Sequence, residues 1–298
     1  MPKAHHKSPL ERAKLRLRGG SDRERALYVG MRKALAPRTT RVRVRAARAE
    51  HTDGIQIPED RGYAILRPGV VADADEVVSY AQERLATTDI GVLSRKGKQF
   101  MLPLVEQSAL DRESPLLRLA LRRDVLAGVA SYLGTVPLLT NINLYLSRST
   151  NRELISSQLF HCDADDTRQV KVFVLCSEVT PENGPLMIMD AADSEDLRER
   201  VGYRYKDRVT DEQADAACGA LELVPVQGAT GTVCLVDTSR CFHYGSRVDN
   251  EASPRLAAML QYLTPHSFML PRDPSRNAPF KGLARPDDPE LVRLVLGA

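Results

Sequence analysis

The residues of this chain best suited to chemistry are three potential metal ligands, His161, Asp163 and His243. The first two lie two positions apart in residues 160–163 (FHCD). On a β-strand, residues i and i+2 point to the same face, so both side chains would face one interior while Cys162 points away. An imidazole and a carboxylate together suit a hard-to-borderline divalent metal. The spacing alone is weak evidence, and the surrounding sequence must support it.

The context of these residues strengthens the metal hypothesis. Residues 171–176 (KVFVLC) are apolar on both faces, as in a strand buried inside a sandwich, and residues 182–185 (ENGP) predict a tight turn. Arg255 follows His243 by twelve positions and would place a cation near the metal. Two histidines and one carboxylate leave three coordination positions open. Such a facial triad is typical of non-haem Fe(II) oxygenases.

Short apolar segments that alternate with turn signals surround the candidate ligands. From about residue 138, roughly eight strands without crossover helices predict an antiparallel jelly roll in a mainly β fold with flanking helices. The polar, helix-like stretch 193–218 is expected to be an insertion between strands. The predicted strands are 139–146, 157–162, 170–178, 186–189, 221–226, 232–236, 241–246 and 256–263.

The region before these strands predicts helices. Residues 56–137 look mostly helical, with apolar residues at helical spacing in 72–85 and in 115–133. One amphipathic helix is also expected at 21–35. The predicted organisation is a basic N-terminal arm (1–55), a metal-binding domain (56–266, with its jelly-roll core at 138–266) and a C-terminal tail (267–298).

Charge is distributed unevenly along the chain. The net charge of +3 hides 15 Lys and Arg against 4 Asp and Glu in residues 1–50, which carry +11, whereas the remainder carries −8. Such a stretch favours contact with a polyanion such as nucleic acid, acidic lipid or an acidic partner. A solvated or loosely helical arm without a specific partner is the alternative, because no nucleic-acid-binding motif accompanies the charge.

Composition narrows the class of protein. With 298 residues, 43% apolar and 27% charged, the chain has the composition of a soluble globular protein that can enclose a pocket. No apolar run approaches the roughly 20 residues that span a bilayer, and the N-terminus lacks a secretory apolar segment. The five cysteines show no CxxC pairing, which argues against a disulfide framework. We therefore expect a cytoplasmic protein without a membrane span.

Taken as an ordered set, the HCD of residues 161–163, the ENGP turn, His243 and Arg255 resemble the phytanoyl-CoA dioxygenase (PhyH-like) family of Fe(II)/2-oxoglutarate-dependent oxygenases. The resemblance covers about residues 115–265. It implies a double-stranded β-helix, a cupin-like jelly roll, in which His161, Asp163 and His243 bind Fe(II). It also implies 2-oxoglutarate and O₂ as cosubstrates, with Arg255 binding the far carboxylate of 2-oxoglutarate through a bidentate pair.

The family resemblance implies a reaction, and two features of this sequence bear on it. The expected reaction is hydroxylation of a small-molecule metabolite, with release of succinate and CO₂. Asp163 is present, whereas halogenase relatives replace this carboxylate with a small residue, so hydroxylation is favoured over halogenation. Residues 189–194 (MDAADS) depart from the Pro-Gly-Ser-His turn of many members, which affects the substrate side of the site.

Further polar residues are candidates for binding the cosubstrate. Lys171 would be a buried cation that needs an anion if its strand face is interior, or a snorkelling lysine if it lies at the edge. Asn143 and Ser246 are candidates for hydrogen bonds to 2-oxoglutarate. Alternatively, Asn143 could lie at the edge of the hydrogen-bond ladder between strands or cap a turn. Arg247 is a weaker competitor of Arg255, since it follows His243 by only four positions.

Two other classes of function remain open. The same triad in a cupin-like protein could hold Zn or Mn for a hydrolase or isomerase that needs no 2-oxoglutarate. Alternatively, the chain could be a non-catalytic binding module whose basic N-terminal arm is the working surface.

Overall fold

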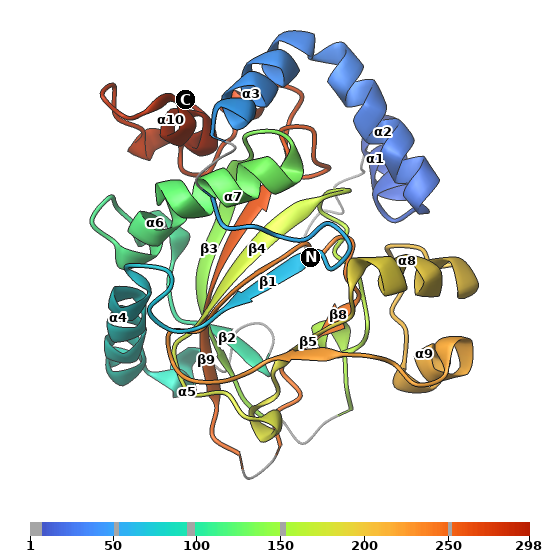
Figure 1. Ribbon diagram of the computed structural model, residues 1–298, viewed down its shortest axis with the longest axis vertical. Coiled ribbons are helices and arrows are strands. Elements are labelled where there is room, and N and C mark those ends of the chain that lie inside the picture. The colour runs from blue at the N-terminus through green and yellow to red at the C-terminus, as the bar shows by residue number, and fades with distance from the viewer. Residues whose placement is uncertain (1–7, 51–53, 94–98, 150–152, 250–251) are drawn as a thin grey trace, which may run out of the picture.

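Two antiparallel sheets form the centre of the computed structural model, which describes residues 8–50, 54–93, 99–149, 153–249 and 252–298 (Figure 1). The large sheet has the strand order β1-β7-β4-β9-β3-β2, and the small sheet the order β6-β5-β8. The strands are β1 (Tyr63–Leu66), β2 (Met101–Pro103), β3 (Leu138–Ser147), β4 (Gln169–Leu175), β5 (Leu186–Ile188), β6 (Val224–Val226), β7 (Val233–Val236), β8 (His243–Tyr244) and β9 (Arg255–Leu263).

Helices cover one face of the large sheet and flank the small sheet (Figure 1). Contacts with β3, β4 or β9 come from α4, α6, α7 and α10, whereas α8 and α9 follow β5 and contact each other. No helix in the described ranges combines the length and apolarity needed to cross a bilayer. The helices are α1 (Pro9–Arg18), α2 (Asp22–Leu35), α3 (Pro37–Ala49), α4 (Ala74–Thr87), α5 (Ile90–Leu93), α6 (Pro115–Ala120), α7 (Arg123–Leu133), α8 (Ala191–Arg200), α9 (Asp211–Cys218) and α10 (Glu290–Leu296).

Strand alternation in the large sheet separates the core from the site. On β4, Val170, Val172 and Val174 are fully buried and belong to the main hydrophobic cluster with the helices. Lys171 and Phe173, which alternate with them, line a cavity on the opposite face. Since successive strand residues point to opposite faces, the same sequence builds the helix-facing core and the cavity wall.

Several predicted elements differ in the structure. The strand predicted at 157–162 is wrong: the 3-10 helix Ser156–Gln158 occupies its start, and only Phe160 and His161 make isolated β-bridges. Residue 156 adopts φ +56, which turns the chain away from an extended path. The helix predicted at 115–133 is interrupted at residues 121–122 and forms α6 and α7.

The predicted helical region also contains two strands that extend the large sheet. β1 pairs with β7 and β2 pairs with β3, so each adds an edge to strands that come much later in the chain. Both strands are short, with four and three residues, and their pairing partners rather than their own patterns determine their conformation. The insertion predicted at 193–218 contains most of α8 and all of α9.

The basic N-terminal region folds into α1, α2 and α3 rather than a loose arm. Three of its arginines are buried, and each donates to backbone carbonyls of the rest of the chain. Arg25 donates to the carbonyls of residues 164 and 166, Arg32 to those of 267, 270 and 271, and Arg43 to those of 136, 137 and 294. These guanidinium groups attach the helices to the strand-containing part of the molecule.

Candidate metal centre and cavity

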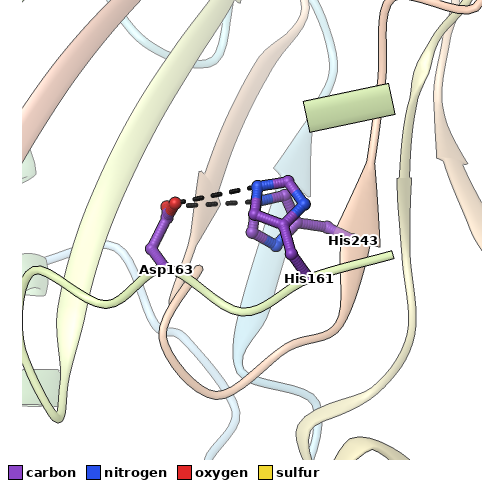
Figure 2. A group of neighbouring side chains, drawn as sticks. All are labelled: His161, Asp163 and His243. Atoms are coloured by element: carbon purple, nitrogen blue, oxygen red, sulfur yellow. Dashed lines mark ion pairs between the residues drawn. The ribbon is translucent and has the colours of Figure 1, made fainter. Parts of the chain in front are cut away.

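His161 and His243 face each other across an antiparallel β-bridge. The backbone N–H of each donates to the carbonyl of the other, at N···O distances of 3.1 and 3.0 Å. Directly paired residues on antiparallel segments project their side chains to the same side. The two imidazole rings accordingly lie with their centroids 4.2 Å apart, and Asp163 faces both of them (Figure 2).

The three side chains have the arrangement of a metal-binding group. Their potential ligand atoms all lie within 4.8 Å of one another. The carboxylate Oδ1 of Asp163 is 3.8 Å from Nε2 of His161, and its Oδ2 is 3.9 Å from Nε2 of His243. This is the only such group of three or more ligands found among the described residues. The donor set, two imidazoles and one carboxylate, suits a divalent transition metal such as Fe(II).

Backbone carbonyls fix the orientation and tautomer of both imidazoles. Nδ1 of His161 is 2.9 Å from the carbonyl oxygen of Leu159, and Nδ1 of His243 is 2.9 Å from that of Cys241. A carbonyl only accepts, so each Nδ1 must carry the proton and donate it. Each Nε2 therefore presents a lone pair toward the centre of the group, as in histidines that bind metals.

Burial keeps the histidines neutral. It lowers the pKa of His161 to about 3, assisted by the neighbouring His243, and it also lowers the pKa of His243. Desolvation disfavours the charged imidazolium in both cases. The two nitrogen ligands are therefore free of protons at neutral pH.

Asp163 is held as a carboxylate by Lys171. Burial alone would raise the pKa of this carboxyl, but the Lys171 ammonium, with Nζ 2.7 Å from Oδ2, holds it well below its usual range. Lys171 had been predicted to bind 2-oxoglutarate or a substrate anion if its strand face were interior. Its strand face is interior, but the anion it contacts is the Asp163 side chain.

A cavity of about 280 Å³ opens beside the triad between the two sheets. The large sheet contributes Phe173, Met259 and Arg255, and the small sheet contributes Leu186 and Val226. Apolar and polar groups together line a space that reaches from His161 and His243 to Arg255. A concave site with a few convergent polar groups is the usual form of a small-molecule binding site.

Arg255 lines the cavity without an acidic partner. Its guanidinium donates to the carbonyl of Gly184 and, at 3.0 Å, to Oγ of Ser246, while Nε is buried without a hydrogen-bond partner. No described carboxylate lies within ion-pair distance of it, and burial lowers the pKa of Arg255 to about 10. Ser246 also lines the cavity and contacts Oγ of Ser147 at 2.9 Å. Burying a guanidinium without a counter-charge is costly, so an anionic ligand in the cavity would stabilise Arg255.

Two other predicted candidates lie outside the cavity wall. Asn143 is on β3, but its carboxamide oxygen accepts from the N–H of Leu144, and its neighbours Asn141 and Tyr145 line the cavity instead. Asn143 lies on the same strand face as Asn141 and Tyr145 and pairs with the cavity residue Met259, so its role toward 2-oxoglutarate stays a prediction. Arg247 forms a bidentate pair with Asp211 at 2.7 and 2.8 Å and does not line the cavity, whereas Arg255 does.

Residues that sequence reasoning missed complete the cavity. Asp165 lies two positions after Asp163, and Arg18 and Gln261 bind its carboxylate. Gln261 shares strand parity with Arg255, so alternation along that strand is the signal that could have identified it. Arg208 comes from the segment between α8 and α9, for which the sequence gives no such signal.

Comparison of the sequence with protein-family models and with curated proteins yielded no match. Comparison with solved structures found similar chains. An apo structure of EctD from S. alaskensis is 20% identical with a TM-score of 0.47, over 69% of this chain and 74% of that chain. The epimerase SnoN in complex with Fe³⁺, alpha ketoglutarate and nogalamycin RO is 19% identical with a TM-score of 0.48, over 74% of this chain and 83% of that chain.

A third similar structure, AviO1 from Streptomyces viridochromogenes Tue57, is 18% identical with a TM-score of 0.44, over 70% of this chain and 92% of that chain. Similarity at these levels assigns no reaction to the chain.

Proposed function

We propose that this chain is an Fe(II)- and 2-oxoglutarate-dependent dioxygenase that hydroxylates a small molecule. One observation carries the proposal. A triad of two neutral imidazoles and one carboxylate shares a cavity with a buried arginine that has no acidic partner among the described residues. The triad suits Fe(II), and the arginine suits the far carboxylate of a dicarboxylate bound beside the metal.

The residues of the site have separate roles in this proposal. His161, Asp163 and His243 would hold the metal, and Arg255 with Ser246 would bind the far carboxylate of 2-oxoglutarate. When bound, Fe(II) with 2-oxoglutarate and O₂ supplies an oxidant for a substrate C–H bond, releasing succinate and CO₂. Lys171 keeps Asp163 ionised and oriented, while Phe173 and Met259 provide apolar walls that exclude water.

We also propose a double-stranded β-helix of the PhyH-like type and hydroxylation as the reaction. The two sheets, with a cavity between them, suit a double-stranded β-helix of the PhyH-like type, although hydrogen bonding does not join them into a closed barrel. Asp163 supplies a carboxylate to the triad, whereas halogenase relatives of the resembled family have a small residue there, which favours hydroxylation.

Anaerobic spectroscopy tests the proposal. Protein mixed with Fe(II) and then with 2-oxoglutarate should develop a visible metal-to-ligand charge-transfer band, which His161→Ala should abolish. Arg255→Met should retain metal binding but need at least tenfold more 2-oxoglutarate, because a charge-assisted pair is lost. A protein that binds metal tightly yet shows no band, with function insensitive to Arg255→Met, would support the cupin-like hydrolase or isomerase instead.

We also propose that the outer face of α3 contacts a polyanion. Arg38, Arg41, Arg45 and Arg48 are exposed, recur at helical spacing along one face, and make no ion pair with a described residue. Neighbouring side chains at such spacing lie about 5–6 Å apart, so their charges act together. This stripe, unlike the buried Arg43 on the same helix, is available to a partner.

The α3 proposal predicts salt-dependent binding to a single-stranded oligonucleotide. Changing the four exposed arginines to glutamine should weaken binding and reduce the slope of log K against log salt by about 3. Lys33→Gln with Arg23→Gln, exposed positions on α2, provides a control that should change the slope less. Equal slopes for the two variants would reject α3 as the contact surface.

A further inference from the structure

Two of the cationic side chains that line the cavity have no acidic partner among the described residues. Binding of 2-oxoglutarate would neutralise only one of them. The charged groups that line the cavity are Asp163, Asp165, Lys171, Arg208 and Arg255. Lys171 pairs with Asp163, and Asp165 pairs with Arg18 from α1. Arg255 and Arg208 remain, and no described carboxylate lies within ion-pair distance of either. Because 2-oxoglutarate would neutralise Arg255, one positive charge at the cavity is left over.

Arg208 is well placed to bind a ligand at the cavity. It is exposed, and it donates from Nε to the carbonyl of Ser156 at 3.2 Å and from Nη1 to the carbonyl of Asp207 at 2.7 Å. These contacts hold the guanidinium in position without neutralising it.

Two serines beside Arg208 support the same conclusion. Ser156 and Ser157 both line the cavity, and Oγ of Ser157 is buried without a hydrogen-bond partner among the described residues. A buried hydroxyl without a partner is costly, so a ligand atom is the natural acceptor. Ser156 adopts φ +56, a strained conformation for a residue other than glycine. Such strain is concentrated at functional sites.

We propose that Arg208, Ser156 and Ser157 form an oxyanion subsite that binds a carboxylate or phosphate group of the substrate. The subsite lies on the segment between α8 and α9 and at the 3-10 helix before His161, on elements separate from Arg255. The substrate class is therefore a small anionic molecule whose anionic group binds at Arg208. This inference rests on the proposed function, because it assigns Arg255 to 2-oxoglutarate.

Relaxation measurements with three matched aromatic probes test the subsite. The full chain is loaded with Mn(II) and 2-oxoglutarate and titrated with benzoate, phenyl phosphate or benzamide, while the paramagnetic relaxation of the probe protons is followed. At least one of the two anions should show saturable relaxation, and the tighter one identifies the oxyanion. Benzamide, which has the shape of benzoate without its charge, should bind at least tenfold more weakly.

Matched variants assign the binding to these residues. Arg208→Gln should weaken anion binding roughly tenfold or more, Arg208→Lys should restore part of it, and Ser157→Ala should weaken it by several fold. Arg204→Gln, on the same segment but paired with Glu24, is the control and should leave binding unchanged. Equal binding of benzamide and benzoate, or unchanged anion binding in a folded Arg208→Gln variant, would overturn the proposal.

Failure of the dioxygenase proposal can be distinguished experimentally from failure of the oxyanion subsite. If the wild-type chain binds neither Mn(II) nor 2-oxoglutarate, the dioxygenase proposal fails. Calorimetric titration of benzoate into the metal-free chain then tests the oxyanion subsite independently of the metal and of 2-oxoglutarate. Benzoate binding that Arg208→Gln weakens and Arg204→Gln preserves would support the subsite, and equal binding by both variants would refute it.

Discussion

At the residue scale, the candidate metal centre is prepared by hydrogen bonds that act before any metal binds. The carbonyls of Leu159 and Cys241 fix both imidazole tautomers, and Lys171 fixes the carboxylate. Preorganised ligands of this kind do not have to lose protons or rotate when the metal binds. The metal affinity should therefore depend on pH in a particular way.

The affinity for Co(II) should be nearly independent of pH between 7.5 and 5.5. The pKa of His161 is about 3 in the folded protein, so protons do not compete for its Nε2 in this range. We expect the dissociation constant to change by less than about threefold, whereas two ordinary histidines with pKa values near 6.5 would weaken binding about 100-fold. Calorimetric titrations at both pH values measure this, and a hundredfold loss would contradict the neutral imidazoles.

Replacing Lys171 with methionine should create the pH dependence that the wild type lacks. Without the ammonium, the effect of burial, which raises the pKa of the Asp163 carboxyl, loses its main opposing charge, so the carboxyl binds a proton more readily as the pH falls. Metal binding must then displace that proton, and the affinity should fall toward pH 5.5. The same Co(II) titrations serve as the measurement, with Lys171→Arg as the charge-retaining control. A flat profile for Lys171→Met would show that Asp163 does not need this cation.

At the scale of elements, part of the site follows from local pattern and part from pairing between distant segments. The strand predicted at 256–263 is present as β9, which begins at Arg255 and places that side chain on the cavity face. Strand parity was also the reason for grouping His161 with Asp163. In the structure Asp163 lies outside any strand, and the bridge between His161 and His243 brings the ligands together. A pairing across 82 positions is not visible in the periodicity of one sequence.

The N-terminal helices show the same limit on prediction from sequence. Charge alone predicted a basic arm, because a buried arginine and a solvated one look identical in composition. Arg25 is fully buried, lies with its guanidinium 3.6 Å from the ring centroid of Tyr205, and donates to the carbonyls that follow Asp163. The same helix thus supports the segment that carries a metal ligand.

Arg25→Met should destabilise both the fold and the metal centre. The change leaves the carbonyl of the buried Asp166 without a donor and removes one of the two donors to the carbonyl of Ala164, and we expect a loss of about 2–4 kcal/mol in the free energy of unfolding. Urea unfolding measures this, and Co(II) affinity should fall as well because the support after Asp163 is lost. Arg23→Met, an exposed position on the same helix, should stay within about 0.5 kcal/mol of the wild type. Equal effects of the two changes would reject a supporting role for Arg25.

At the scale of the whole molecule, the proposed ligands connect two sheets that strand pairing leaves separate. His243 belongs to the small sheet, whereas Lys171 and Arg255 belong to the large sheet, and the cavity lies between them. A metal bound to the triad and a dicarboxylate extending to Arg255 would together link the two sheets. Because each ligand binds the folded chain and not the unfolded one, both should raise its stability.

We expect the stabilisation by 2-oxoglutarate to depend on the stabilisation by the metal. Metal at about 100 times its dissociation constant should stabilise the fold by about 2.7 kcal/mol, which raises the thermal midpoint by several degrees. 2-Oxoglutarate alone should add little, but with metal present it should add a second increment, because the metal supplies half of its binding site. Scanning calorimetry under anaerobic conditions with Fe(II) measures both increments.

Variants separate the two increments of stability. His243→Ala should remove both, since it disrupts the metal centre, whereas Arg255→Met should remove only the second, because it leaves the triad intact. A 2-oxoglutarate increment that is as large without metal as with it would show that the dicarboxylate binds elsewhere on the chain. That result would separate Arg255 from the metal centre and contradict a shared site between the two sheets.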